Sequence, residues 1–361
     1  MARSRPSRNR SSSLLDAWVN PRFFDFWASR LNRLWSWQRP LARVVSCERI
    51  GPDAVTLALR RNRHCGPVLP GQHVNVGAEI DGRMVTRCYS PTCHADGTLS
   101  ISVKAIDGGR LSRHLCDVVR PGDVVELGAG FGEMTLPRTT AEPWLFLAAG
   151  SGITPMASLL RDLAARDMPA TVDLMYWARS EADLWFADEL RGMAAKFPSF
   201  RLHLFTTRDV PAREDVAHGR IAAPVLEQRL DEMPNRHVYA CGPAGFVDAA
   251  RALLAGSVAS FDAEAFSMPE APLAEEGEVQ VHLAKRGLTL SLPRAATLLS
   301  ALEAAGLRPA SGCRMGICHT CACGKRSGAT HDLLTGETAS EPVSSLRLCV
   351  SRPASDLVLD L

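Results

Sequence analysis

The sequence predicts a multi-domain protein in which an antiparallel β-barrel precedes a doubly wound α/β domain with a parallel sheet, and a small α+β domain follows. The first observation is length, because 361 residues are too many for one ordinary core. The second is the change of pattern along the chain. Short alternating runs separated by turn residues fill 41–140, and apolar strands alternate with helical patterns in 141–266. Residues 278–361 hold two strand-like runs, a helix and a cysteine-rich loop, after a Pro- and Glu-rich linker at 267–277.

The composition is that of a soluble globular protein, with 46% hydrophobic and 22% charged residues. The net charge is only +2, yet residues 1–45 carry nine arginines against Asp16 and Asp25, so residues 1–40 read as a basic arm with a helix. Eleven cysteines at uneven spacings do not suggest a disulfide framework. No signal peptide or transmembrane helix is expected, and we expect a cytoplasmic location.

The stretch 20–37, "NPRFFDFWASRLNRLWSW", predicts a short amphipathic helix capped by Asn20. Five large apolar side chains are expected on one face: Phe24, Trp27, Leu31, Leu34 and Trp35. Two interpretations stay open, since this face could dock on an anionic membrane or a membrane-bound partner, or it could pack on the barrel. Nucleic-acid binding is not expected, because no basic patch extends into the folded domains.

The stretch "GCRMGICHTC" holds three cysteines, as Cys313-x4-Cys318-x2-Cys321, and Cys349 follows after 27 intervening residues. Four thiolates at this spacing can hold a [2Fe–2S] cluster. Structural zinc and unligated buried thiols are the alternatives, but zinc normally prefers paired short spacings. Cys323 lies outside the tetrad. Residues 278–361 resemble the plant-type ferredoxin domain, which implies a β-grasp fold and a cluster that carries one electron at a time.

The stretch "RCYSP" lies at a predicted strand end and offers three groups suited to a flavin. Arg87 can pair with diphosphate charge, the Tyr89 ring can stack on the isoalloxazine, and the Ser90 hydroxyl can bond near N5. An ordinary half-buried strand tyrosine is the alternative. About twenty residues later, Gly109 and Ser112 begin a helical run whose backbone N–H groups can take phosphate.

Two further stretches follow predicted strands of the α/β domain. In "AAGSGITPM", Gly150 and Gly152 permit close backbone approach of a pyrophosphate, although Pro155 stands where the usual fingerprint has a third glycine. A plain strand-to-helix turn explains this stretch equally well. In "VYACGP", Cys241 and Gly242 end a strand at the edge where such sheets bind ligands, and a buried inert cysteine is the alternative.

Together and in this order, "RCYSP", "GSGITP" and "ACGP" make residues 41–262 resemble the ferredoxin–NADP reductase family. The resemblance implies a flavin-binding barrel and a nicotinamide-binding domain. Expected flavin contacts are Arg87, Tyr89 and Ser90, with Lys104, Gly109 and Ser112 as neighbours. Expected nicotinamide-dinucleotide contacts are Gly150, Gly152, Thr154, Pro155, Cys241, Gly242 and Pro243. Ser90 and Cys241 are the expected catalytic residues, which orient the reacting rings and do not act as nucleophiles.

The choice of cofactors rests on weaker signals. The segment "GFGEMTLP" looks like that of FAD-containing members, so FAD is preferred over FMN. Arg179 and Ser180 lie just past a predicted strand, and Arg208 follows the next one. An arginine there can accommodate a 2′-phosphate, which favours NADPH over NADH. Solvated surface arginines are the alternative.

These parts belong together because nicotinamide delivers two electrons as a hydride whereas the cluster accepts one, and a flavin can do both. We therefore expect an NAD(P)H-dependent reductase that passes electrons to a partner oxygenase. The layout and the segment "LLDAWVNPRFFDFW" resemble the electron donors of membrane-bound di-iron desaturases, so a desaturase or hydroxylase is the expected partner, with possible membrane contact through 20–37. The alternatives are direct reduction of a small acceptor (quinone, ferric chelate or nitric oxide) and a redox-sensing module.

Overall fold

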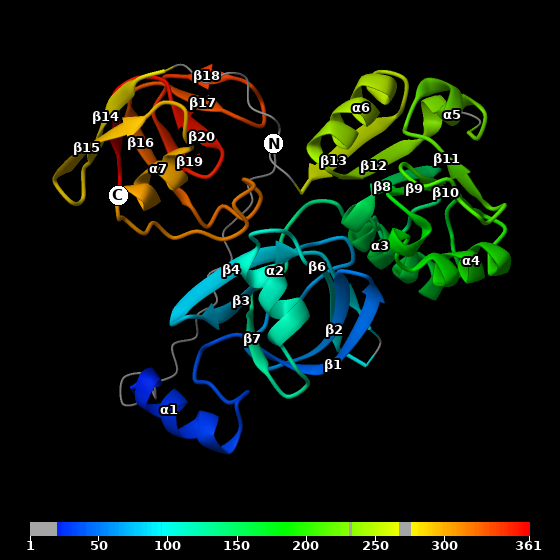
Figure 1. Cartoon of the computed structure of the whole chain (residues 1–361), viewed down its shortest axis with the longest axis horizontal. Coiled ribbons are helices and arrows are strands. Elements are labelled where there is room, and N and C mark those ends of the chain that lie inside the picture. Colours follow the sequence, from blue (N-terminus) through cyan, green and yellow to red (C-terminus); the bar gives the residue numbers. More distant parts are fainter. Residues whose placement is uncertain (1–19, 95, 231–232, 267–275) are drawn as a thin grey trace.

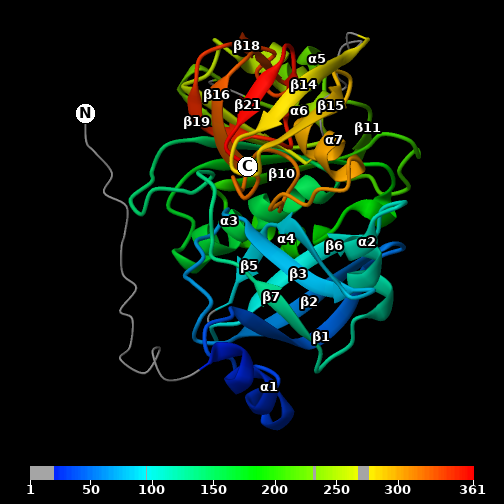
Figure 2. The same ribbon diagram turned by 90° about the vertical axis from the view of Figure 1, so that its left-hand side faces the viewer.

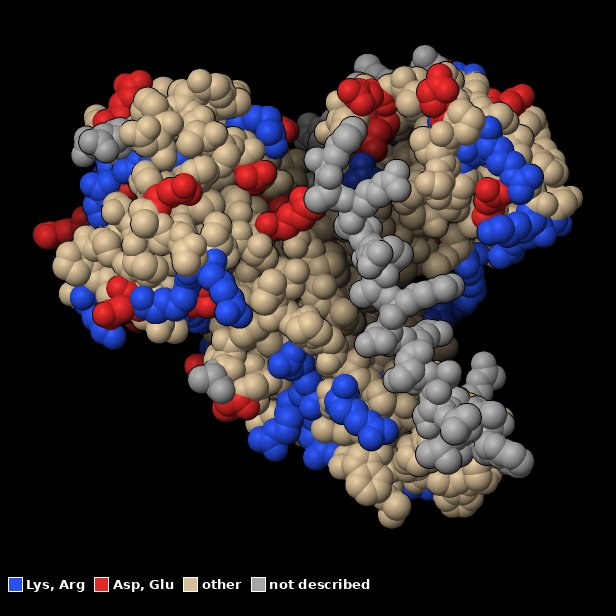
Figure 3. All heavy atoms as spheres, turned by 180° about the vertical axis from the view of Figure 1, so that it is seen from behind, with Lys and Arg blue, Asp and Glu red and all other residues tan. Residues whose placement is uncertain are grey.

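The computed structural model of the chain describes residues 20–94, 96–230, 233–266 and 276–361. The C-terminal and α/β domains lie side by side above the β-barrel, which carries helix α1 at its opposite end (Figure 1). A quarter turn places the C-terminal domain above the barrel, with α1 again at the opposite end (Figure 2). From behind, the surface is hollowed between the C-terminal and α/β domains (Figure 3). Residues 1–19 of the predicted arm and 267–275 of the predicted linker lie outside the described residues.

Helix α1 (Pro21–Leu31) is shorter than the helix that the sequence predicts over 20–37. The chain after it turns back, so that Asp25 accepts hydrogen bonds from Ser36 Oγ at 3.0 Å and from the Trp37 backbone N–H at 2.6 Å. The Phe24 ring packs edge-on against Trp37, and Ala28 is buried. These contacts fix the side of α1 that carries Asp25 and Ala28 against the turn that follows the helix.

The predicted apolar face of this helix is divided. Phe24 and Leu34 are half-buried, whereas Trp27, Leu31 and Trp35 are exposed. Periodicity gives the width of an apolar arc, but the barrel covers only the part of it nearest Ala28. The rest of the arc faces solvent.

The barrel is a seven-stranded antiparallel sheet in the order β4-β3-β7-β1-β2-β6-β5. Its strands are β1 (Leu41–Gly51), β2 (Ala54–Arg61), β3 (Val74–Ile80), β4 (Arg83–Tyr89), β5 (Pro91–Cys93), β6 (Leu99–Lys104) and β7 (Val124–Leu127). Strand β6 shows why these residues form one face of a barrel. Leu99, Ile101 and Val103 are buried and alternate with outward polar residues, as a half-buried strand requires. Helix α2 (Arg110–Arg113) and the wide turn η2 (His114–Val118) follow β6 and close one end of the core.

The second domain is a six-stranded parallel sheet in the order β11-β10-β9-β8-β12-β13. Its strands are β8 (Trp144–Ala149), β9 (Val172–Ala178), β10 (Phe200–Thr206), β11 (Val216–His218), β12 (His237–Gly242) and β13 (Ser260–Ala265). Its helices and short turns are η3 (Gly150–Gly152), α3 (Ile153–Ala165), η4 (Glu181–Asp183), α4 (Ala187–Lys196), α5 (Ala223–Glu227), η5 (Met233–Asn235) and α6 (Ala244–Leu254). Every residue of β8 and β9 is buried, as expected where helices cover both faces of a parallel sheet.

The C-terminal domain has a five-stranded sheet in the order β15-β14-β21-β16-β19 and a three-stranded sheet in the order β18-β17-β20. Its elements are β14 (Glu278–Leu283), β15 (Leu288–Pro293), α7 (Leu298–Ala304), β16 (Ala322–Ser327), β17 (Thr330–Asp332), β18 (Thr338–Ala339), β19 (Val343–Arg347), β20 (Ser351–Pro353) and β21 (Leu357–Leu359). The predicted three-part fold class is confirmed. Within the described residues, no helix combines the length and apolarity needed to cross a bilayer.

Candidate active site

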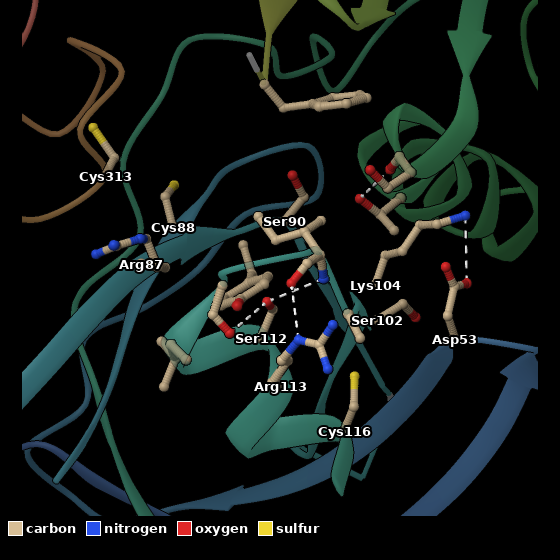
Figure 4. A pocket seen from close by; sticks show the side chains of 18 of the residues that line it. Asp53, Arg87, Cys88, Ser90, Ser102, Lys104, Ser112, Arg113, Cys116 and Cys313 are labelled. Atoms are coloured by element: carbon tan, nitrogen blue, oxygen red, sulfur yellow. Dashed lines mark hydrogen bonds and ion pairs between the residues drawn. The ribbon is translucent and has the colours of Figure 1, made fainter. Parts of the chain in front are cut away.

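A cavity of about 830 Å³ opens where the three domains meet (Figure 4). Its walls hold the predicted barrel residues Arg87, Tyr89, Ser90, Lys104, Gly109 and Ser112. The α/β domain contributes Thr154, Pro155, Arg179 and Cys241, and the cysteine loop contributes Cys313, Met315 and Ile317. The predicted residues that are not in this wall are Gly150, Gly152, Ser180, Arg208, Gly242, Pro243, Cys318, Cys321 and Cys349. The structure therefore gathers all three motif regions around one space.

A chain of three polar side chains crosses from the barrel to the α/β domain in this cavity. The Ser90 hydroxyl lies 2.9 Å from His73 Nδ1, and His73 Nε2 contacts the Glu264 carboxylate. His73 precedes β3 and is buried, whereas Glu264 comes from β13, 191 positions away in sequence. Sequence reasoning missed His73 and Glu264. Their only local signal is that each is a polar residue at one end of a strand.

The N-terminal end of α2 is shaped for a close neighbour. A Cβ placed on Gly109 would lie 2.3 Å from Ser112 Oγ and 2.5 Å from an Ile106 side-chain carbon, so a larger residue there would have to displace these side chains. Basic side chains flank the position, since Arg110 and Arg113 also line the cavity. Such a glycine turn beside cations suits the phosphates of a flavin nucleotide.

The nicotinamide side depends on a close approach of two strand ends. A Cβ on Gly152 would lie 2.1 Å from the Cys241 carbonyl oxygen and 2.9 Å from the Gly242 nitrogen, so the ends of β8 and β12 can meet only without a side chain. Gly150 has a φ of +56°, which favours glycine. Burial raises the pKa of the Cys241 thiol well above its ordinary value, so this thiol stays protonated.

The cations predicted for a 2′-phosphate lie at neighbouring strand ends. The Arg208 backbone N–H donates to the Arg179 carbonyl at 3.0 Å, and Arg208 is exposed. Ser180 Oγ donates to Asp183 at 2.9 Å, and the Lys104 ammonium of the barrel lies 3.0 Å from the same carboxylate. Ser180 and Lys104 thus meet at Asp183, which sequence reasoning also missed, in a link between the two domains.

The four predicted cluster ligands form two pairs of thiols. Cys313 hydrogen-bonds to Cys318, which raises the pKa of Cys313 and lowers that of Cys318; Cys349 and Cys321 behave in the same way. Among the described residues, no three His, Cys, Asp or Glu side chains converge on one point. Two pairs match the donor set of a [2Fe–2S] cluster, in which each iron takes two thiolates besides the bridging sulfides.

Backbone N–H groups also point at these sulfurs. The N–H groups of Met315 and Cys318 donate to Cys313 Sγ at 3.3 Å each, and that of Gly316 donates to Cys349 Sγ at 3.2 Å. Hydrogen bonds to thiolate sulfur stabilise its negative charge, so the loop suits an anionic cluster. Cys323 lies in the hydrophobic core of this domain, beside Cys321 and Cys349 of the tetrad.

Arg87 and Cys88 lie on the side of the cavity nearest the cysteine loop (Figure 4). Burial and the neighbouring Arg314 guanidinium lower the pKa of Arg87. Arg314 is itself neutralised by Glu303 of α7, through contacts of 2.8 and 2.5 Å. Arg87 therefore lies on the side of the flavin motif that faces the cysteine loop. Its neighbour there is Arg314, whose positive charge is balanced by the Glu303 carboxylate.

Fold and site together define a flavin- and iron–sulfur-dependent oxidoreductase. Three family models match the chain in order: an oxidoreductase FAD-binding domain at 42–135, an oxidoreductase NAD-binding domain at 146–252 and a 2Fe-2S iron-sulfur cluster binding domain at 281–354. The chain belongs to the ferredoxin–NADP reductase family, in the group that carries a C-terminal [2Fe–2S] domain. Its cofactors are FAD, NAD(P)H and a [2Fe–2S] cluster, as predicted.

Individual relatives resemble almost the whole chain. An NADPH oxidoreductase of Mycobacterium tuberculosis is 34% identical over 91% of this chain and 86% of its own length. The ferredoxin reductase component of 3-ketosteroid-9-alpha-monooxygenase from the same species is 33% identical over 85% and 88%. The solved structure of phthalate dioxygenase reductase has a TM-score of 0.60 and 26% identity, and the match covers 89% of this chain and 97% of that one.

Proposed function

We propose that this reductase takes a hydride from NADPH and delivers electrons one at a time, through FAD and the [2Fe–2S] cluster, to a partner oxygenase. The observation that carries the proposal is the shared cavity, whose wall includes Ser90, Cys241 and Cys313 from the three motif regions. Bound flavin supplies the conversion from paired to single electrons.

The chain's own residues would orient the reactants and manage one proton. Ser90 Oγ would bond near the flavin N5, and the His73 and Glu264 side chains continue from that hydroxyl. Glu264 is partly exposed, so a proton at Ser90 Oγ could pass by way of His73 to the carboxylate and then to water. Cys241, which is neutral and buried, would form an uncharged wall for the nicotinamide ring.

NADPH is proposed as the donor because Arg179 lines the cavity and Arg208 lies at the neighbouring strand end. The name of the M. tuberculosis relative, an NADPH oxidoreductase, agrees with this choice. In the double variant Arg179→Ala/Arg208→Ala we expect KM for NADPH to rise about tenfold, since each arginine–phosphate contact is charge-assisted. KM for NADH should change little, and an equal rise for both nucleotides would contradict the proposal.

The acceptor is proposed to be an oxygenase, and in particular a membrane-bound di-iron desaturase or hydroxylase. Several relatives are named as reductase components of monooxygenases, which supports the broader statement. The narrower statement, a membrane-bound di-iron desaturase or hydroxylase, is supported by the layout of the chain and by the sequence of residues 14–27, "LLDAWVNPRFFDFW". A cytoplasmic protein peripheral to the inner face of the membrane, held through residues 20–37, would meet such an acceptor.

The test is NADPH oxidation by the full chain with a detergent-solubilised desaturase, compared with quinone, ferric chelate and nitric oxide. We expect the desaturase to be reduced fastest, and the cluster-free Cys318→Ser variant to lose that reaction. If Cys318→Ser kept full activity on the physiological acceptor, direct reduction by the flavin would replace the proposed route.

A further inference from the structure

We infer that the outer face of α1, together with the adjoining barrel groove, is a binding surface for an anionic phospholipid bilayer. The inference specifies the surface and the lipid for the membrane contact named in the proposed function. It rests on that function only for the reason why the protein would bind a membrane, which is to reach a membrane-bound acceptor. Helix α1 lies at the end of the barrel away from the C-terminal domain (Figure 2). The physical basis of the inference is the exposure of the apolar and basic side chains of this helix.

The first argument is the unusual exposure of large apolar residues. Phe23, Trp27 and Leu31 follow each other at four-residue intervals, so they form one stripe along α1, and they are 67%, 52% and 82% exposed. Phe26 and Trp35 lie beside this stripe and are also more than half exposed. Soluble proteins rarely leave a continuous group of such side chains in water.

The second argument is that exposed apolar side chains of the barrel share a groove with α1. A groove of about 880 Å³ lies between α1 and the barrel, and its walls include Phe26 and Trp35 on one side and Met84 and Val118 on the other. Met84 is 47% and Val118 is 58% exposed. The groove lining also carries Asp25, Glu79, Asp123 and Glu126, of which the last two pair with Arg33 and Arg39. A planar lipid surface can cover both the protruding stripe and the rim of the groove.

The third argument is charge. The Arg30 guanidinium lies over the rings of Phe26 and Trp27, at 4.6 and 5.3 Å from their centroids, and it is exposed. Residues 1–19 of the sequence add four arginines and a single acidic residue, Asp16. Aromatic and basic side chains that share the exposed side of a short helix are typical of helices that lie in an anionic membrane interface.

The fourth argument concerns presentation. The hydrogen bonds of Asp25 to Ser36 and Trp37 fix the inner side of α1, so the outer stripe projects from a folded support. Basic side chains also gather over the barrel beside this end of the molecule (Figure 3). A protruding helix with exposed aromatic and basic side chains can insert into the headgroup region of a bilayer.

The experiment is flotation of the holoprotein with vesicles of phosphatidylcholine alone or mixed with phosphatidylglycerol. We expect binding to the mixed vesicles and at least about tenfold weaker binding by Phe23→Ser/Trp27→Ser/Leu31→Ser. Arg30→Gln should weaken binding to mixed vesicles by about fivefold and leave binding to neutral vesicles unchanged. Leu69→Ser, which removes a 55% exposed leucine from the barrel loop between β2 and β3, is the control and should bind normally.

Flavin and cluster spectra and ferricyanide reduction should be the same in all these variants, which shows that they are folded. Absence of binding to mixed vesicles, or binding that the triple variant leaves intact, would overturn the inference. A concentration-dependent dimer abolished by the triple variant would overturn it in favour of a second copy. Electron delivery to solubilised acceptor tests the proposed function separately, because that assay contains no bilayer.

Discussion

Two sides of the cavity differ in the contacts that join them to the barrel. One, the nicotinamide border, is formed by the α/β domain, and the other by the cysteine loop. On the nicotinamide border, Ser90, His73 and Glu264 form a continuous hydrogen-bonded chain between two domains, and Gly152 touches the Cys241 carbonyl without room for one carbon atom. On the side of the cavity next to the cysteine loop, which we call the cluster border, Cys313 forms part of the wall. Arg87 lies near Arg314 there, and Glu303 balances the charge of Arg314.

The difference follows from what crosses each border. Hydride transfer needs donor and acceptor atoms in near contact and aligned, so small displacements are costly. A single electron can cross a longer gap without bond alignment. We therefore expect substitutions on the nicotinamide border to act through geometry, and those on the cluster border to act through the presence of the cluster.

The largest effect is expected on the cluster border. Cys349→Ser removes one of two thiolates from an iron, so the cluster absorbance should disappear and electron delivery to the partner should fall about 100-fold or more. Ferricyanide reduction at the flavin should remain within about threefold, because the nicotinamide border is untouched. Cys323→Ser, a buried cysteine outside the tetrad, is the control and should keep the cluster. Equal loss of both activities in Cys349→Ser would contradict the separation of the borders.

The next effect is geometric. In Gly152→Ala the new methyl group would displace the end of β12, and a shift of this kind should slow flavin reduction by NADPH roughly 100-fold. Stopped-flow bleaching of the flavin measures it, and cluster absorbance should be unchanged. Gly245→Ala is the matched control, because its Cβ would meet open space. A normal rate in Gly152→Ala would show that this contact is not required.

A smaller effect is expected at Glu264. Glu264→Gln keeps the shape of the side chain but weakens its ability to accept a proton from His73, so turnover should fall about tenfold. Comparison of rates in H2O and D2O should show an altered solvent isotope effect. Asp262→Asn changes an exposed residue of the same strand and should leave both quantities unchanged. An unaltered isotope effect in Glu264→Gln would exclude proton passage by this route.

The smallest effect concerns the link between Lys104 and Asp183. Burial alone would raise the pKa of Asp183, but hydrogen bonds from Lys104 and Ser180 outweigh it and hold the pKa below its ordinary value. The carboxylate therefore stabilises the fold above about pH 4, and this contribution is lost as the pH falls further. Asp183→Asn should lower the free energy of unfolding by about 0.5 kcal/mol at pH 7.

That difference should shrink as the pH falls below about 4, which denaturant titrations at pH 7 and at descending acidic pH values would check. Asp188→Asn, in which a highly exposed carboxylate pairs with Arg191, is the control and should have less effect. A difference that persists at low pH would mean that Asp183 acts through packing instead of charge.

The three-part fold and the classes of cofactor could be predicted from the sequence, because their signals are local. The fold follows from the change in periodicity along the chain, and the cofactor classes follow from short motifs such as the cysteine tetrad and "RCYSP". The roles of the individual residues in those motifs stay predictions. The contact between His73 and Glu264 could not be predicted in this way, because it joins segments 191 positions apart and depends on how two domains pack.

Helix α1 shows a second limit. Periodicity identified the apolar arc, but it could not tell which part the barrel would cover, since that depends on the turn that brings Ser36 and Trp37 to Asp25. As a result Trp27 was correctly assigned to the arc, while Phe23, the other exposed ring of the stripe, was not expected on it.

The backbone of the cysteine loop has a consequence for the stability of the chain before the cluster is inserted. Arg314 and His319 have φ values of 62° and 54°, a conformation that costs a residue with a side chain about 1 kcal/mol. Iron–sulfur bonds offset that cost once the metal has arrived. A newly made chain still waiting for iron carries the cost alone, so this loop should open first.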